Sequence, residues 1–454
     1  MKKLLLSIVG LLIVGAIALP LVIKNQVESQ IEVNKQSLLK NGMELNIIKE
    51  DGYISTTRDY TLKIINGKKF RDYILEKFIQ IDPNYKVFIE LMQKNTKKNI
   101  RIALDGTTFS GTIKNSNLLL FPTKIELSLV KLSAKIMSGL KPNDKVSDNI
   151  KLMLNEKKIT FFITLDSNQN VSQIIMKDID EDIKDKGKVV NFKLKGHKLD
   201  LDITKSLKGS YTIDTQSVKS DRFEMQTKGI NYTFDYLTQF QNDASIHVDS
   251  FSVLERKNSF KVGNIDIGTN VKDADNKTLK INVNYKIKDV YFKEKMTAKL
   301  DSFVLNLDIF DLDKEGLVSV NEAYSKIALN STSLTQKDIE ALTNGVQKIL
   351  NSGIKAQINS SISNLIFKKT NLNKIDFKMN MMLNPNTNTL KGFQMIQAVE
   401  IDGSVTMNKS DVQELLKLDR SLERFAKLGK KDGDNVVFNY EFKKGSLYLN
   451  GNKL

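Results

Sequence analysis

The sequence predicts an α+β protein in which an N-terminal transmembrane helix precedes a large, mainly antiparallel β-sheet structure with a few covering helices. The first observation is an uncharged apolar run from Leu4 to Ile23. The second is a long stretch, 158–310, in which apolar and polar residues alternate. Alternation of period two gives a strand one apolar and one polar face. The third is helical spacing of apolar residues on either side of that stretch, in 67–99 and 321–357.

The N-terminal run determines where we expect the chain to be located. Its roughly 20 residues would form a helix about 30 Å long, enough to cross the hydrocarbon core of a bilayer. Lys2 and Lys3 precede the run and favour a cytoplasmic N-terminus. We therefore expect a single-pass protein of the cytoplasmic (inner) membrane, held through residues 4–23, with the bulk of the chain in the periplasm. The alternative is a cleaved signal peptide, because Ala16-Ile17-Ala18 resembles a cleavage site, and it also exports the domain.

Four regions follow from these patterns. They are 1–24, a transmembrane anchor or uncleaved signal; 25–157, an α+β N-terminal exported region; 158–320, an antiparallel β meander; and 321–454, an α+β C-terminal region that ends in a β-hairpin. In the exported N-terminal region we expect a helical stalk over 24–45 and two short strands around the turn Asp51-Gly52. We expect a helix over 67–99, a hairpin around Asp105-Gly106, and a strand followed by a helix in 124–157.

The C-terminal region is predicted from shorter signals. Two strands are expected around 375–381 and 392–405. Ser410-Asp411-Val412-Gln413 has the pattern of a capping box and predicts a helix that runs to about Leu428. Alternating apolar residues on either side of Lys444-Gly445 predict a closing hairpin.

Composition excludes several classes of function. The chain has no Cys, which rules out disulfides, thiolate zinc sites and Cys nucleophiles. Lys and Arg outnumber Asp and Glu by 69 to 53, a net charge of +16, but the lysines are scattered and group only in pairs such as Lys97-Lys98. No aromatic–basic motif of the RNA-binding type occurs, so we expect no nucleic-acid partner. We interpret the charge as a solvated surface, with weak attraction to anionic lipid as the alternative.

The most specific local signal is the stretch from Asp311 to Glu322, which has the pattern of a calcium-binding loop. Such a loop needs six or seven oxygens that converge around a sharp turn, with a glycine at its sixth position, and Gly316 stands there. The candidate ligands are Asp311, Asp313, Glu315, Ser319 and Glu322. The structural alternative is a charged turn between a strand and a capped helix.

Motifs of catalysis do not occur. The sequence has no Gly-x-Ser-x-Gly elbow, no P-loop and no Gly-x-Gly-x-x-Gly fingerprint. The only two histidines, His197 and His247, lie in strand-like stretches, and alternation places His247 on the polar face of its strand. We therefore expect a protein that is not an enzyme and has no cofactor besides the candidate calcium ion.

Two short motifs carry a family resemblance. The block Ile48-Lys49-Glu50-Asp51-Gly52-Tyr53-Ile54-Ser55-Thr56-Thr57-Arg58 is similar to a Gly-aromatic-x-Ser stretch early in the exported part of the YdgA-like family of bacterial envelope proteins. The ending Gly445-Ser446-Leu447-Tyr448-Leu449-Asn450-Gly451 is similar to the closing hairpin of that family. The layout resembles this family over the whole chain, and the function of the family is largely undefined. A more distant likeness is to the AsmA-like envelope proteins, which are linked to outer-membrane assembly and lipid traffic.

The functional expectation is a non-enzymatic, membrane-anchored envelope protein that binds lipid or supports envelope assembly. Its basis is the apolar face of the long sheet, which could line a groove for acyl chains. The structural alternative is that the helices predicted at 67–99 and 321–357 cover this face. The functional alternative is an interaction scaffold for envelope proteins, or a homo-oligomer formed through exposed strand edges. A hydrolase is the least favoured alternative.

Overall fold

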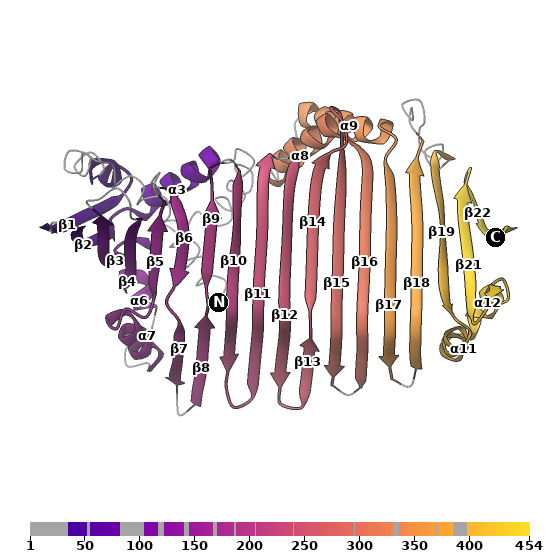
Figure 1. Ribbon diagram of the computed structural model, residues 1–454, viewed down its shortest axis with the longest axis horizontal. Coiled ribbons are helices and arrows are strands. Elements are labelled where there is room, and N and C mark those ends of the chain that lie inside the picture. Colours follow the sequence, from indigo (N-terminus) through magenta and orange to yellow (C-terminus); the bar gives the residue numbers. More distant parts are fainter. Residues whose placement is uncertain are drawn as a thin grey trace. The chain divides into compact units, whose positions relative to one another are not determined.

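In the computed structural model the chain forms two compact units, each built of antiparallel strands with its own helices (Figure 1). Unit 1 is Met1–Thr204 with Gly209–Asp221, and unit 2 is Lys205–Lys208 with Arg222–Leu454. The structure describes residues 35–51, 55–81, 104–116, 122–139, 145–166, 170–185, 188–204, 206–238, 240–294, 296–329, 336–368, 370–384 and 397–454.

Strands of unit 1 pair mainly with their neighbours in the sequence, as in a meander. The strands are β1 (Met43–Asp51), β2 (Ser55–Ile64), β3 (Thr108–Ser116), β4 (Thr123–Lys131), β5 (Thr160–Leu165), β6 (Val171–Met176), β7 (Ile179–Asp185), β8 (Lys188–Lys195), β9 (Lys198–Asp202) and β10 (Leu207–Lys219). The helices are α3 (Gly67–Ile81), α6 (Ala134–Ser138) and α7 (Lys145–Asn155). Two interrupted strands, β6 with β7 and β8 with β9, continue the ladder towards β10.

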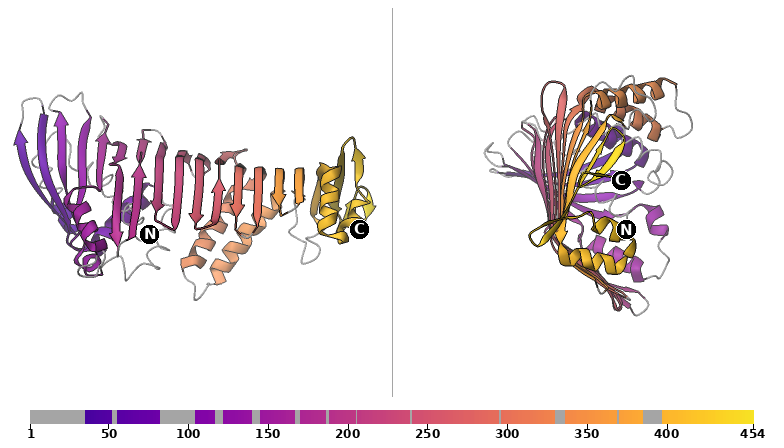
Figure 2. Two further views of the ribbon diagram at one scale, coloured as in Figure 1. Left: turned by 90° about the horizontal axis from the view of Figure 1, so that it is seen from below. Right: turned by 90° about the vertical axis from the view of Figure 1, so that its right-hand side faces the viewer.

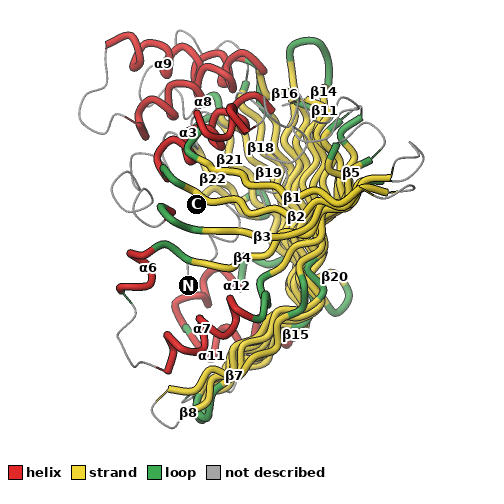
Figure 3. The backbone as a smooth tube through the Cα atoms, turned by 90° about the vertical axis from the view of Figure 1, so that its left-hand side faces the viewer, coloured by secondary structure: helices red, strands yellow, loops and turns green. Residues whose placement is uncertain are grey.

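Helices close the apolar face of the unit 1 sheet (Figure 3). Phe109, Ile125 and Phe161 point from three neighbouring strands into one core and are almost completely buried. Helix α3 adds Phe70 to this core and α7 adds Leu154. The alternative in which helices cover the sheet is therefore confirmed for unit 1 by α3, at the start of the predicted segment 67–99.

Several predictions for unit 1 can be compared with the structure. The hairpin around Asp51-Gly52 is confirmed, because β1 and β2 pair along their whole length. Of the predicted helix over 67–99, residues 67–81 are helical and 82–99 lie outside the described residues. Of the predicted stalk, 35–40 are helical, but β1 begins at Met43. Of the hairpin predicted around Asp105-Gly106, residues 100–103 lie outside the described residues, and the return strand β3 pairs with β2 and β4 on its two edges.

Unit 2 is a longer meander with two helical segments. Its strands are β11 (Phe223–Thr238), β12 (Gln241–Glu255), β13 (Asn258–Val262), β14 (Ile265–Asp273), β15 (Thr278–Lys293), β16 (Thr297–Asp313), β17 (Lys355–Phe367), β18 (Thr370–Leu383), β19 (Val399–Asn408), β20 (Lys430–Asp432), β21 (Asn435–Lys443), β22 (Ser446–Leu449) and β23 (Asn452–Lys453). The helices are α8 (Lys314–Leu329), α9 (Gln336–Asn351), α11 (Lys409–Leu418) and α12 (Glu423–Ala426). Both segments, α8–α9 and α11–α12, lie on the same side of the unit 2 sheet (Figure 2, right).

Helices α8 and α9 cross at two buried glycines. A Cβ atom at Gly345 would lie 3.0 Å from the carbonyl oxygen of Gly316 and 2.9 Å from the Cβ of Ser319. The two backbones therefore approach more closely than side chains would allow. This pair is the helical region predicted at 321–357, but α8 begins at Lys314, seven residues earlier than expected.

Strand alternation in 158–310 is confirmed by the strands from β5 to β16. The predicted strands around 375–381 and 392–405 correspond to β18 and β19, with 385–396 outside the described residues. Strand β17 was not predicted. The closing hairpin is confirmed, and Lys444 and Gly445 have φ angles of 52° and 74°, as a type I′ turn requires.

The helix predicted from Ser410 is present as α11, but Ser410 does not cap it, and it ends at Leu418 instead of about Leu428. Helix α11 begins at Lys409 after Asn408, and Asp411 is fully buried. The Asp411 carboxylate accepts hydrogen bonds from the backbone N–H groups of Asn373 and Lys374, each at 3.0 Å, and from the Asn373 side-chain amide at 2.8 Å. The carboxylate therefore ties α11 to the start of β18.

Two predicted domain boundaries fall between paired strands. The boundary at 157 separates β4 from β5, and the boundary at 320 separates β16 from β17, yet both pairs are hydrogen-bonded neighbours. The chain instead passes from unit 1 to unit 2 between residues 204 and 222. In the part of the chain that the structure describes, no helix is long and apolar enough to cross a membrane. The predicted span 4–23 lies outside the described residues.

A line of left-handed residues crosses the strands of unit 2. Gly229 in β11, Asp289 in β15 and Asn364 in β17 have φ angles of 60°, 56° and 50°. Pairing is interrupted at each of these positions and resumes beyond it in the same register. The apolar alternation changes parity there, for example from Ile287 to Val290 in β15. Two residues without an apolar side chain therefore separate two apolar zones on each strand: Lys228-Gly229, Lys288-Asp289 and Ser363-Asn364. We call this line the polar band.

Candidate functional site

Mainly apolar side chains from neighbouring strands form three rows between the polar band and α8–α9, interrupted by Ser360, Thr269 and Gly403. One row, with Ser360 inside it, is Ile246, Ile267, Tyr285, Leu305, Phe377, Val405 and Phe438. The row nearer the polar band is Val248, Ile265, Ile287, Phe303, Ile362, Ile375, Met407 and Val436. The row nearer the helices is Ala244, Thr269, Val283, Leu307, Ile358, Met379, Gly403 and Tyr440. We call these three rows the apolar face.

Among the residues that the structure describes, those that cover the apolar face lie at its ends. Beneath the base of α8, Leu279 and Leu312 are buried. At the other end, Gly429 follows α12 and lies against Val436 and Phe438. In the centre, on β14 to β18, the apolar side chains remain only half-buried. A single layer of strands cannot bury both of its faces, so the centre of the unit 2 sheet exposes apolar surface. In unit 1, helices α3 and α7 close the corresponding surface.

The dimensions of the apolar face suit a long apolar ligand. Its eight strands, about 4.8 Å apart, extend for about 34 Å, and its three rows cover about 14 Å along the strands. The whole face covers roughly 500 Å² of the sheet, and its open centre on β14 to β18 accounts for about half of that. The acyl chains of one membrane leaflet are about 15 Å long, so they would fit along the strands or across them.

Methionines contribute to the apolar face on β18 and β19. Met379 and Met407 belong to the rows, and Met381 follows on β18. Methionine is unbranched and polarizable and adapts to ligands of different shape. This composition favours apolar chains of variable structure over a single rigid ligand.

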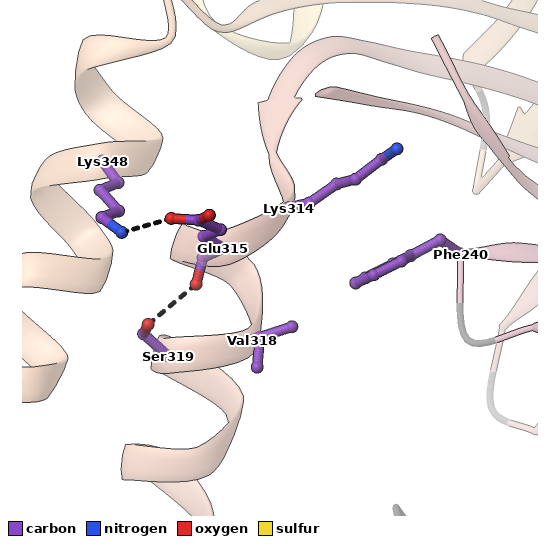
Figure 4. A pocket seen from close by; sticks show the side chains of 6 residues that line it. All are labelled: Phe240, Lys314, Glu315, Val318, Ser319 and Lys348. Carbon is purple, nitrogen blue, oxygen red and sulfur yellow. Dashed lines mark hydrogen bonds and ion pairs between the residues drawn. The ribbon is translucent and has the colours of Figure 1, made fainter. Parts of the chain in front are cut away.

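An open hollow of about 340 Å³ lies between α8, α9 and the turn before β12 (Figure 4). It is lined by Phe240, Lys314, Glu315, Val318, Ser319 and Lys348. Lys348 Nζ donates a hydrogen bond to Glu315 Oε2 at 2.6 Å, and Lys314 Nζ lies 2.8 Å from Asp273 Oδ1. Both cations therefore have carboxylate partners, and the hollow has no unpaired charge from them to offer an anion.

The residues of the predicted calcium loop lie on a strand end and a helix. Asp311 and Asp313 end β16, and Asp313 accepts a hydrogen bond from the Gly316 N–H at 2.6 Å. Asp311 pairs with Lys355, and Glu315 pairs with Lys348. The Ser319 hydroxyl donates to the Glu315 carbonyl oxygen at 2.8 Å.

This geometry is that of the alternative, a capped helix after a strand, because the backbone from Lys314 onward is helical instead of wrapping around an ion. The side chain of Glu322 lies outside the described residues. Among the described side chains, no group of three or more His, Asp or Glu could hold a metal ion. Calcium binding stays a prediction from the sequence, without support from these contacts.

The two histidines lie in different units and have opposite environments. His247 in β12 stands between two carboxylates, with Nδ1 at 2.5 Å from Asp266 and Nε2 at 2.9 Å from Asp249. These hydrogen bonds raise the pKa of His247 above its ordinary value of 6.5. Burial lowers the pKa of His197, whose Nδ1 lies 2.8 Å from the Tyr211 hydroxyl.

We expect the two imidazoles to titrate on opposite sides of pH 6.5. A raised pKa in the folded state means that His247 contributes stability that is complete below about pH 6.5 and is lost as the pH rises through its folded pKa. NMR titration of the carbon-bound ring protons measures both values without interference, since the chain has only two histidines. His247→Gln should remove the higher of the two transitions, and retention of that transition would contradict the assignment.

Of the comparisons with known proteins, the one with protein families found a match. The model of the family described as "Bacterial protein of unknown function (DUF945)" matches residues 1–454. Searches of curated proteins and of solved structures found no match. The chain therefore belongs to the bacterial protein family DUF945, whose function is unknown.

Proposed function

We propose that unit 2 binds the acyl chains of lipids on its apolar face, as part of a non-enzymatic, membrane-anchored envelope protein. The observation that carries this proposal is the alignment of three rows of mainly apolar side chains across eight strands, together with their half-buried state in the centre of the sheet. Acyl chains are the occupant that best matches this surface, because the rows contain few hydrogen-bonding groups with which to select a polar ligand.

Two features of the sequence support the same occupant. The apolar run 4–23 would keep the chain at a membrane, where lipids are the abundant apolar molecules. The resemblance to YdgA-like proteins, and the more distant likeness to AsmA-like proteins in anchor and long amphipathic sheet, points to the envelope and to lipid traffic. The proposal requires no calcium ion, because the acyl chains would bind through apolar contacts.

The alternative proposal is a scaffold that uses the apolar face or a strand edge for another protein. Strand β1 favours it, because β2 pairs with one edge of β1 and Ile48 on β1 is exposed. A protein partner would need complementary shape over the whole face, whereas acyl chains need only apolar surface. We therefore place the scaffold second.

The test is native mass spectrometry of the full-length protein, extracted gently from membranes, with lipid extraction from the same sample. Val283 and Asn284 are neighbours on β15 that point to opposite faces of the sheet. Val283→Glu puts a carboxylate on the apolar face, and Asn284→Glu puts the same group on the polar face. Desolvating a carboxylate costs more than the ~1.4 kcal/mol that corresponds to a tenfold change in affinity.

We expect Val283→Glu to lose at least about tenfold in lipid occupancy and Asn284→Glu to keep it. Lipid that surrounds residues 4–23 contributes equally to both variants, so only the difference between them reports on unit 2. Circular dichroism of both variants must match the parent protein. Equal lipid content in the two folded variants would refute acyl binding at this face.

A further inference from the structure

At one end of the unit 2 strands, where the chain turns from each strand to the next, basic and apolar residues lie together. Three hairpins turn there, β12–β13, β15–β16 and β17–β18, on the far side of the polar band from α8–α9 (Figure 1). Exposed cations at these turns are Arg256, Lys257, Lys293 and Lys368, and the exposed carboxylates are Glu255 and Glu294. Cations therefore outnumber carboxylates at this edge, which we call the basic edge.

Large apolar side chains protrude beside these cations. Phe292 is 37% exposed, Met296 is 41% exposed and Phe367 is 42% exposed. The ladder places Phe292 opposite Ala298 and Ala298 opposite Phe367, so the two rings lie in one row about 10 Å apart. Lys368 Nζ lies 5.4 Å from the centre of the Phe367 ring. A lysine in this position can lay its apolar stem along the ring and keep its charge in water, which is how long basic side chains behave at a membrane interface.

We propose that the basic edge docks on an anionic phospholipid surface, with Phe292, Met296 and Phe367 inserted among the headgroups. Charge complementarity selects an anionic surface, because each Lys or Arg near such a surface contributes attraction. The exposed Phe and Met side chains favour a membrane over a nucleic-acid duplex, since the phosphate backbone of a duplex offers no apolar layer to receive them. The three hairpin turns follow one another about 10 Å apart, so several of them could reach the same membrane surface.

Docking by this edge goes beyond acyl binding on the apolar face and does not require it. If both hold, the strands of unit 2 rise from the membrane surface, and the apolar face would begin beyond the polar band. The two proposals fail separately, because Val283→Glu alters only the apolar face and the variants below alter only the basic edge.

The experiment uses a tryptophan reporter in a chain that has no tryptophan of its own. Full-length Phe292→Trp is reconstituted into vesicles of phosphatidylglycerol with phosphatidylcholine, or of phosphatidylcholine alone, each with brominated acyl chains as quenchers. Leu237→Trp is the matched control, since Leu237 ends β11 at the opposite edge of the sheet and is 58% exposed. Phe367→Trp provides a second reporter on the basic edge.

We expect quenching and a blue shift for Phe292→Trp and Phe367→Trp in the anionic vesicles, and neither for Leu237→Trp. In the Phe292→Trp background, Arg256→Glu and Lys293→Glu should each weaken the effect about fivefold, whereas Lys272→Glu near the opposite edge should not. Quenching that is equal in both kinds of vesicle, equal at position 237, or unchanged by the charge reversals would overturn the proposal. Absence of quenching in every vesicle would also overturn it and leave the basic edge to a protein partner.

Discussion

Phe161→Ala should lower the free energy of unfolding of unit 1 by about 3–5 kcal/mol, the usual cost of removing a large ring from a closed core. Phe161 lies on β5 between Leu127 of β4 and Met176 of β6, and it is 1% exposed. Because helices cover this side of the sheet, the surrounding side chains cannot collapse into the space that the ring leaves.

Phe162→Ala is the matched control, since Phe162 is the next residue on the same strand, points to the other face and is 44% exposed. Its loss should cost less than about 1 kcal/mol. Hydrogen exchange of the β4–β6 peptides in the full chain measures both variants without interference from unit 2. Equal losses of protection would mean that the helices do not close unit 1.

Strand content could be predicted because a sheet with one wet face imposes alternation on every strand. The run from Leu279 to Ile287 is an example, in which each second residue is apolar and the residues between are polar. The closing hairpin could be predicted because Lys444-Gly445 meets the dihedral demands of a tight turn. Both signals are local, because residues only a few positions apart in the chain determine the strand and the turn.

Neither strand β17 nor the polar band was predicted, because the alternation of apolar residues is sparse in the first and interrupted in the second. In β17, Ile358 and Ile362 alternate with serine and asparagine, so the apolar signal is sparse. At the polar band the parity change resembles the end of a strand, although the strand continues. Comparison of parity on both sides of Asp289 with that around Asn364 would have revealed a common break, since each strand changes parity at a similar place.

Whether helices cover the apolar face could not be predicted from the sequence. Coverage depends on where α8–α9 packs, and that is set by the contact of Gly316 with Gly345 and by contacts at the base of α8. The calcium pattern shows the same limit, because the oxygens of Asp313 and Glu315 serve equally well as a helix cap and an ion pair. Local spacing specifies the donors and acceptors, and tertiary contacts determine their partners.

Gly229→Val should destabilise unit 2 by about 2–5 kcal/mol and should test whether the polar band is a fixed feature of the sheet. A side chain held at a φ of 60° costs about 1–3 kcal/mol in backbone strain, and more for a β-branched residue. A Cβ atom at Gly229 would also lie 1.9 Å from Asp249 Oδ2 and 2.8 Å from Asp249 Cβ. Relieving that overlap requires movement of β12, which adds about 1–3 kcal/mol.

Gly268→Val is the control that separates this strain from a general effect of valine. Gly268 lies in β14, where a Cβ atom would meet only the Asn284 side chain at 3.9 Å, and valine is favoured in a strand. Its effect should stay within about 0.5 kcal/mol in urea unfolding followed by hydrogen exchange of unit 2. A large loss at position 229 alone means that the left-handed residue is required, and the strands must then break their alternation at this level. Similar small effects at both positions would mean that β11 can straighten there, and the separation of the apolar face from the basic edge would then have to come from the side chains alone.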